Sequence, residues 1–154
     1  DVAYFAKWWR DGFLIGLTSG NFDPISDSEI SESVNSMIHS KDNYHFMIES
    51  DDQTVGHLSL IKANGGWYET QIVIGESEHR GKSIGTLAIQ QLIKFAKTKG
   101  IGKVFLEVRP DNLAAIKCYE KSGFVKTQLI DHKDNPNLLQ TLRMEVYLDI
   151  LVDE

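Results

Sequence analysis

The sequence has few of the residues that would tie it to an oxidising compartment, a metal or a membrane. It contains a single cysteine, Cys118, which excludes an internal disulfide and a multi-thiolate zinc site. Its longest apolar run, at about 13–17, is far shorter than the roughly 20 residues that a membrane-spanning helix needs. The five histidines lack metal-ligand spacing; they are His39, His45, His57, His79 and His132. We therefore expect a cytoplasmic protein with no metal and no membrane partner.

Low-complexity tracts, internal repeats and long runs of like charge are also missing from the 154 residues. With 42% hydrophobic and 25% charged residues, the chain has the composition of one globular domain around one core. We therefore predict a single domain over residues 1–154. The chain begins with Asp1 and not with methionine, so a removed targeting peptide and a first strand ahead of residue 1 both stay open.

The net charge of the chain is negative, at −6. An acidic surface repels the phosphate backbone of nucleic acids and attracts cationic amines and basic peptides. We therefore expect no nucleic-acid partner. The composition leaves a monomer and a homodimer equally open.

The spacing of apolar residues predicts helices and strands along the whole chain. Helices are predicted at 2–9, from about 26, at 82–99 and at 113–121, and strands at 44–49, 54–61, 67–74, 104–108, 124–130 and 138–148. Ser26 and Glu29 have the spacing of a capping box at the start of the second helix. The unbroken apolar run Ile72-Val73-Ile74 predicts a central strand that is buried on both faces. This order indicates an α/β (α+β) fold with a mixed, mainly antiparallel sheet of six to seven strands and helices on both faces. One strand–helix–strand unit supplies its parallel pair.

The string IVIGESEHRGKSIG places a buried strand, a polar loop and a long helix in succession. The free backbone N–H groups of a first helical turn and the helix dipole favour an anion there. Gly81 and Gly85 would let a phosphate approach the backbone, and Arg80 and Lys82 add two cationic side chains. The loop alone is equally compatible with a helix start that carries solvated basic residues.

Two nucleotide-binding motifs fit this loop less well. A Walker loop would need glycine at position 76, where the chain has Glu76, whose carboxylate would repel a triphosphate. A dinucleotide fingerprint is excluded because Gly75, Gly81 and Gly85 have the wrong spacing. A P-loop nucleotide-binding protein is therefore a less favoured alternative.

A second string, LEVRPDNLAAIKCYEKSGF, follows downstream. Together, the two strings resemble the GCN5-related N-acetyltransferase (GNAT) family. The family patterns (Q/R)-x-x-G-x-(G/A) and N-x-x-(S/A)-x-x-x-Y-x-x-x-G-F match at Arg80, Gly85, Asn112, Ala115, Tyr119, Gly123 and Phe124. The chain departs from the family at Ser83, where a glycine is usual. Its N-terminal part is loosely similar to the Rim-type acetyltransferases of ribosomal-protein N-termini.

The resemblance implies acetyl-CoA as cosubstrate and a set of residues that bind it. The strand end would hold the pantetheine arm through its backbone, in a gap where this strand splays from strand 104–108. The loop and first helical turn would hold the pyrophosphate, and the Ser83 hydroxyl would donate to it. The implied cofactor-binding residues are Ile72, Val73, Ile74, Arg80, Gly81, Lys82, Ser83, Ile84, Gly85, Asn112, Ala115 and Tyr119.

The resemblance also implies how the acetyl group is transferred. Asn112 and Tyr119 are seven residues apart, two helical turns, so both should project from one helix face, with the Tyr119 phenol protonating the departing thiolate. Glu107 matches the base of a Rim-type enzyme, and Glu69 and a water chain stay open as alternative bases. Cys118 points away from Tyr119 and is interpreted as a small packing residue, which favours direct transfer without an acyl-enzyme.

The sequence thus predicts an acetyltransferase that acts on a primary amine. A protein or peptide N-terminus, a polyamine and an aminoglycoside are all open as acceptors. A non-catalytic acyl-CoA-binding module is the alternative from another functional class.

Overall fold

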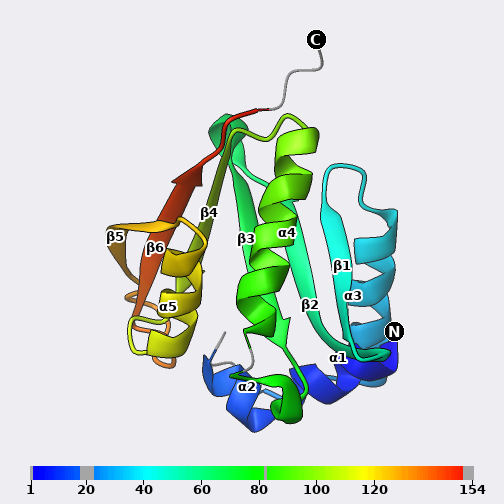
Figure 1. Ribbon diagram of the computed structural model, residues 1–154. Coiled ribbons are helices and arrows are strands. Elements are labelled where there is room, and N and C mark those ends of the chain that lie inside the picture. The colour runs from blue at the N-terminus through cyan, green and yellow to red at the C-terminus, as the bar shows by residue number, and fades with distance from the viewer. Residues whose placement is uncertain (1, 18–22, 82, 151–154) are drawn as a thin grey trace.

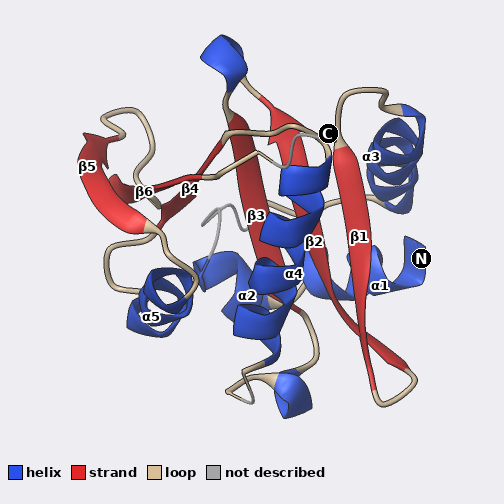
Figure 2. Cartoon of the chain, turned by 45° about the horizontal axis from the view of Figure 1, so that its top comes forward, coloured by secondary structure: helices blue, strands red, loops and turns tan. Residues whose placement is uncertain are grey.

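The computed structural model describes residues 2–17, 23–81 and 83–150. They form a six-stranded sheet, in the order β1-β2-β3-β4-β6-β5, with helices on both faces (Figures 1 and 2). The strands are β1 (Tyr44–Ser50), β2 (Gln53–Lys62), β3 (Tyr68–Ile74), β4 (Lys103–Val108), β5 (Val125–Asp131) and β6 (Gln140–Tyr147). The helices are α1 (Val2–Trp9), α2 (Gly12–Leu17), α3 (Asp27–His39), α4 (Ile84–Thr98) and α5 (Leu113–Lys121), with short 3-10 turns η1 (Asn64–Gly66) and η2 (Ser77–His79). The predicted fold class is confirmed.

Local sequence signals account for most element boundaries. Helix α3 begins with the predicted capping box, in which the Ser26 hydroxyl accepts from the Glu29 N–H and the Glu29 carboxylate accepts from the Ser26 N–H. The β1–β2 hairpin turns over Asp51 and Asp52, both in the left-handed conformation that such two-residue turns require. Helix α2 was not predicted, because six residues are too few to show a helical period; the Asp11 carboxylate caps its start.

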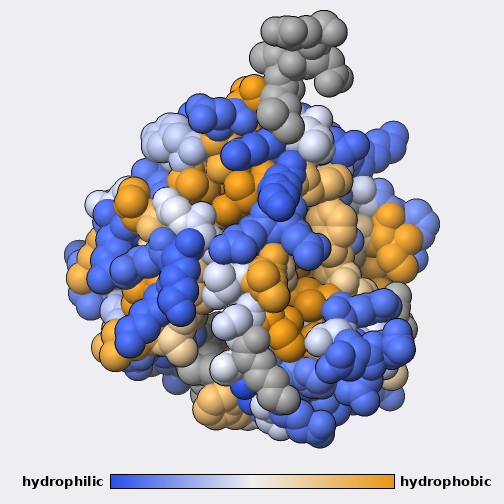
Figure 3. Space-filling view, in the orientation of Figure 1, coloured by the Kyte–Doolittle hydropathy of each residue, from blue (hydrophilic) through white to orange (hydrophobic). Residues whose placement is uncertain are grey.

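One face of the sheet is covered by α4 and α5 (Figure 1). It holds the larger hydrophobic core, in which Ile89 and Leu92 of α4 and Ile116 and Tyr119 of α5 pack with Met144 of β6. This side of the molecule shows both apolar and polar groups at its surface (Figure 3). Burial of these side chains fixes both helices on the sheet.

The opposite face holds a second core beneath the N-terminal helices. Phe5 and Trp8 of α1 pack with Ile30 and Val34 of α3, and Val73 of β3 packs against this group. Val73 belongs to this face because side chains alternate along a strand, whereas Ile72 and Ile74 pack into the larger core. The central strand therefore joins the two cores.

Strands β3 and β4 part soon after they meet. Their parallel pairing covers only two residue pairs, Tyr68↔Val104 and Glu69↔Phe105. By contrast, β3 pairs with β2 along its whole length, and β4 pairs with β6 along its whole length. Figure 1 shows the two strands close at one end and separated toward the other. Because of this split, the side chains of 72–74 are half-buried, and the prediction of full burial on both faces was wrong.

Candidate active site

The split between β3 and β4 leaves one edge of β3 without a strand partner from Thr70 to Ile74 within the described sheet. Backbone N–H and C=O groups on such an edge are available to an extended ligand. Ile72, Val73 and Ile74, the residues predicted to hold pantetheine, lie along this edge. The split that the family resemblance implied is therefore present, although contact with a cofactor stays a prediction.

Thr70 lies at the point where the strands part. Its side chain is 2% exposed, and its hydroxyl has no hydrogen-bond partner among the described residues. A buried hydroxyl without a partner costs about 1–3 kcal/mol. This cost would be relieved by a water or ligand group in the gap.

The loop after β3 leads into α4, as the sequence predicted. Gly81 is in the left-handed conformation, with φ of 75°, and a Cβ there would meet no atom within 4 Å. At Gly85 a Cβ would lie 3.6 Å from the Cys118 Sγ, an ordinary contact, in agreement with the glycine or alanine of the motif. Ile84 opens α4 and packs on the larger core, and Lys82 lies outside the described residues.

Ser83 is the N-cap of α4 and has an unusual backbone. Its φ is 62°, a left-handed conformation that a non-glycine residue adopts at a cost of about 1–2 kcal/mol. Its side chain is exposed and makes no capping hydrogen bond to the helix. The departure from glycine therefore introduces backbone strain, while the hydroxyl is not committed to the helix.

Arg80 is engaged by the protein itself. Its Nε donates to the carbonyl of Ile74 at 2.9 Å, and Nη2 donates to that of Gly75 at 3.0 Å. Its guanidinium also lies 3.9 Å from an Asp11 carboxylate oxygen and 5.0 Å from the centre of the Phe13 ring. Arg80 thus fixes the end of β3 to the start of α2, a role that the motif did not reveal.

A second connection joins α1 to the same loop. The Glu76 carboxylate accepts from the Lys7 ammonium at 2.8 and 2.9 Å and from the Trp8 indole N–H at 3.1 Å. The Lys7 hydrogen bond is the main reason why the pKa of Glu76 is below its usual value. Trp8 packs directly over Gly75, where any Cβ would overlap the indole. Glu76, which argued against a Walker loop, therefore anchors α1.

Asn112 is the N-cap of α5, and its side-chain oxygen accepts from the Ala115 N–H at 3.3 Å. Because a cap residue has non-helical backbone angles, the seven-residue helical spacing alone does not place Asn112 on the face of Tyr119, and their shared face stays a prediction. Ala115 is half-buried against the larger core. The predicted cofactor contacts of all three residues stay predictions.

Tyr119 is 8% exposed and packs edge-on against Phe124, with ring centres 5.9 Å apart. Burial is the main cause that raises the pKa of its phenol above the usual value, and the adjacent Cys118 adds to the increase. The hydroxyl therefore keeps its proton at neutral pH and is a weaker acid than a phenol in water. Cys118 is half-buried, and its sulfur accepts a hydrogen bond from Thr86.

Glu107 lies on the other face of β4 and belongs to a hydrogen-bonded chain. The Thr141 hydroxyl donates to the Glu107 Oε1 at 2.6 Å, and His132 Nε2 lies 2.7 Å from the Thr141 oxygen. His132 Nε2 is also 3.8 Å from the Glu107 Oε1. Sequence reasoning missed His132 and Thr141, because their approach depends on the pairing of β6 with β4 and β5.

Glu69, the alternative base, shares this face of the sheet. Partial burial is the main cause that raises its pKa, and the nearby Glu107 carboxylate raises it further. Arg143 is stacked on the Phe105 ring at 3.8 Å and donates to Glu145 at 2.8 Å. The sheet here therefore presents carboxylates beside aromatic rings, a surface that favours cations.

The histidines serve protein hydrogen bonds. His39 contacts the Asn35 carbonyl, His79 contacts Gln53, and His45 and His57 contact each other at 3.1 Å. No group of three or more potential metal ligands occurs among the described residues. None of the helices in the described ranges has the length and apolar character to cross a membrane.

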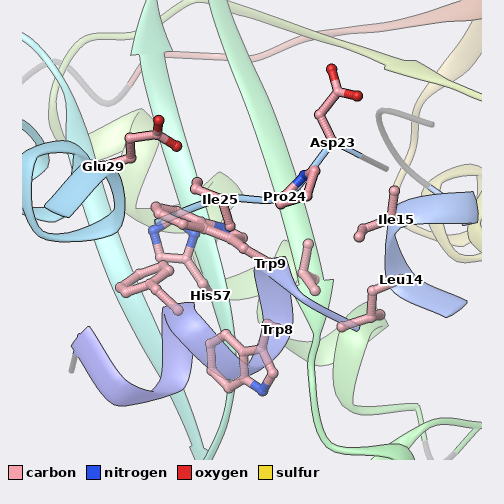
Figure 4. Close-up of a pocket in the computed structure, with 11 residues that line it drawn as sticks. Trp8, Trp9, Leu14, Ile15, Asp23, Pro24, Ile25, Glu29 and His57 are labelled. Carbon is pink, nitrogen blue, oxygen red and sulfur yellow. The ribbon is translucent and has the colours of Figure 1, made fainter. Parts of the chain in front are cut away.

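A cavity opens on the face of the sheet that carries the N-terminal helices (Figure 4). It has a volume of about 460 Å³ and is lined by residues of α1, α2, the segment before α3, α3, β2 and β3. Val73 forms part of its wall, so the cavity adjoins the strand that borders the split. This cavity was not predicted from the sequence.

Comparison with known proteins identifies the family. Residues 2–124 match the model of the acetyltransferase (GNAT) family. The chain is 44% identical over 70 residues to the uncharacterized N-acetyltransferase YobR of Bacillus subtilis, covering 46% of this chain but only 27% of YobR. It is 21% identical over 150 residues to an aminoglycoside N(6')-acetyltransferase of Klebsiella pneumoniae, covering 88% of this chain and 75% of that protein.

Solved structures agree with this result. The spermidine N-acetyltransferase of Vibrio cholerae, in complex with CoA and spermine, superimposes with a TM-score of 0.83 at 22% identity. The match covers 96% of this chain and 89% of that chain. A match of this extent shows that the two proteins share the same fold. The chain therefore belongs to the GNAT family of acetyltransferases, as the two sequence motifs predicted.

Proposed function

We propose that this protein transfers the acetyl group of acetyl-CoA directly to a primary amine, in the gap between β3 and β4. The observation that supports this most strongly is the parting of the two strands after only two residue pairs. The gap gives an extended thioester a free strand edge to pair with. The buried Tyr119 of α5 would supply the proton donor.

The cofactor would lie along the split. The backbone of Ile72, Val73 and Ile74 would pair with the pantetheine amides, and the start of α4 would face the pyrophosphate. Gly81 leaves room for a phosphate beside the loop, and the Ser83 hydroxyl is available as a donor. Arg80 would act through the loop, since its guanidinium already binds two strand carbonyls.

The chemistry follows from the groups at the gap. The neutral amine nitrogen attacks the thioester carbon, a C–N bond forms, and the C–S bond breaks. The Tyr119 hydroxyl gives its proton to the departing thiolate, and the Glu107 carboxylate takes the proton that the amine loses, directly or through water. Thr141 and His132 hold the Glu107 carboxylate in place. Glu69, whose pKa is raised, is the second candidate for the same step.

The acceptor is expected to be cationic in solution. The net charge of −6 and the carboxylates Glu69 and Glu107 attract an ammonium group. Two relatives act on such compounds, since one is named as an aminoglycoside acetyltransferase and another as a spermidine acetyltransferase. A peptide N-terminus is the third class to be tested.

A thiol-release assay tests the proposal. The protein is mixed with acetyl-CoA and, in turn, a polyamine, an aminoglycoside, a monoamine and a peptide, while calorimetry measures acetyl-CoA binding. We expect release of CoA that depends on the amine. Tight acetyl-CoA binding with no CoA release for any amine would instead support a non-catalytic acyl-CoA-binding module.

A further inference from the structure

The cavity beside Val73 has both apolar and polar walls, and its two carboxylates are seen in Figure 4. Aromatic rings of α1 and β2 form one part of its lining, beside Ile25 and Val73, and Asp23 and Glu29 form another. A volume of about 460 Å³ lies in the range of pockets that enclose small organic molecules. The cavity is therefore large enough for the body of a small amine.

The rings in the wall hold one another in place. Phe5 lies at the centre of the group, with ring centres 6.0 Å from Trp8, 5.0 Å from Trp9 and 5.0 Å from His57. Trp8 is fixed further, because its indole N–H donates to Glu76. Such edge-on and tilted contacts keep aromatic rings rigid, so the wall is preorganised for a flat or branched apolar group.

Among the described lining residues, the charged groups have one sign. Two carboxylates, Asp23 and Glu29, belong to the lining. Burial is the main cause that lowers the pKa of His57 to about 4, so the imidazole is neutral at pH 7 and does not repel an ammonium group. The cavity therefore attracts a cation.

We infer that this cavity binds the acceptor, and that the acceptor is a primary amine carrying an aromatic or branched apolar group. The inference rests on the proposed function for the reaction itself. Val73 belongs both to the cavity wall and to the strand edge at the gap, so an amine whose body fills the cavity lies next to the thioester. The hydroxyls of an aminoglycoside would lose their partners in water wherever they faced the aromatic and aliphatic part of the wall. A polyamine would leave the aromatic walls largely unused.

The first experiment compares three probes. Thiol release is measured with 2-phenylethylamine, spermidine and kanamycin, and calorimetry measures the binding of each amine to the acetyl-CoA-free protein. We expect phenylethylamine to have at least a tenfold higher kcat/KM than either other amine. A preference for spermidine or kanamycin would overturn the inference.

The second experiment fills the cavity. Ile25→Trp should raise the Kd and the KM for phenylethylamine by roughly tenfold, because the larger ring takes the space of the ligand, while acetyl-CoA binding stays unchanged. Ile38→Trp is the matched control, at an α3 position that is 72% exposed and outside this cavity. If both variants bind phenylethylamine as the wild type does, the cavity is not the acceptor site.

The third experiment removes one charge. Glu29→Gln keeps an oxygen that can accept from the Ser26 N–H, so the capping box survives, and it should raise the KM about threefold at low salt. Glu32→Gln, on the exposed side of the same helix, should have no effect. Equal effects of the two variants would overturn the role of the cavity charge.

The two proposals fail in different ways. If phenylethylamine binds and Ile25→Trp weakens it, but no amine releases CoA, the proposed transfer fails and the binding site stands. If CoA is released with some amine but Ile25→Trp changes nothing, the transfer stands and the cavity inference fails. If phenylethylamine neither binds nor reacts, the cavity inference fails.

Discussion

The two faces of the sheet differ in how far apart in sequence their interacting residues lie. On the α4 and α5 face, the loop, the helix that follows it and the motif tyrosine lie within 80–119 and are held by one continuous core. On the opposite face, contacts join α1 to Glu76, β6 to Glu107, and α1 to β2. The cofactor side is thus built from neighbouring segments, and the acceptor side from distant ones.

This difference indicates how the protein divides its tasks. In the proposed function, the cofactor is bound by a compact segment that has a recognisable sequence motif. The proposed acceptor site is formed by side chains from several elements that meet only in the folded chain. Changes on the acceptor side should therefore alter stability and substrate choice together, whereas changes on the cofactor side should act mainly on the reaction.

The largest effect on stability is expected at Gly75, which follows β3 and packs against Trp8 of α1. Gly75→Ala places a Cβ inside the Trp8 indole, which must move away from Glu76. We expect the free energy of unfolding to fall by about 3 kcal/mol, measured by urea denaturation. Gly12→Ala is the control, because a Cβ there meets no atom within 4 Å. Equal stability of the two variants would show that α1 does not depend on this contact.

The next largest effect is expected on kcat, at Glu107 on the sheet face opposite α4 and α5. Glu107→Gln keeps the size of the side chain but removes the proton acceptor, and we expect kcat to fall about 30-fold with the KM for acetyl-CoA unchanged. Thr141→Val, which removes the hydroxyl that holds Glu107, should lower kcat by about threefold. A Glu107→Gln enzyme with full kcat would leave Glu69 or water as the base.

A smaller effect is expected at the cofactor loop. Ser83→Gly relieves the left-handed backbone and should raise the free energy of unfolding by about 1 kcal/mol. Ser83→Ala keeps the Cβ and removes the hydroxyl, so it should give no gain in stability. If alanine stabilises as much as glycine, the strain argument is wrong.

The smallest effect concerns Glu69 and depends on pH. A raised carboxyl pKa means that the folded state binds the proton more tightly than the unfolded state. The protonated Glu69 therefore contributes its full stabilisation below the ordinary carboxyl pKa of about 4.5. This stabilisation is lost as the pH rises through the higher pKa that Glu69 has in the folded state. Glu69→Gln should consequently be more stable than the wild type by about 0.5 kcal/mol at pH 7.5, with a smaller difference at pH 4. If the stability advantage of Glu69→Gln over the wild type were larger at pH 4 than at pH 7.5, the direction of the Glu69 pKa shift would be wrong.

The same comparison explains what the sequence could predict. The fold class, the capping box of α3 and the loop–helix segment depend on residues close in the chain, and all were predicted from local patterns. The family followed because its two motifs lie within 80–124. The approach of Arg80 to Asp11 was not predicted, since it depends on α2, a helix too short to leave a periodic pattern. The hydrogen bonds of Arg80 to the carbonyls of Ile74 and Gly75 were not predicted either.

The acceptor side could not be predicted for a physical reason. The contact of Glu107 with Thr141 spans 34 residues and requires the exact register of β4 with β6. The split of β3 from β4 depends on where a parallel pairing stops, and no residue pattern marks that point. The aromatic cavity requires α1, α2 and α3 to be placed over the sheet at once.

The most direct test of the account is the Tyr119→Phe variant, because the buried phenol is the proposed acid. Phenylalanine fills the same space, so folding and the Kd for acetyl-CoA should stay as they are in the wild type. With thiol release under saturating amine, the account predicts a fall in kcat of about 100-fold. An unchanged kcat would contradict the role of Tyr119 and the placement of the reaction in the gap.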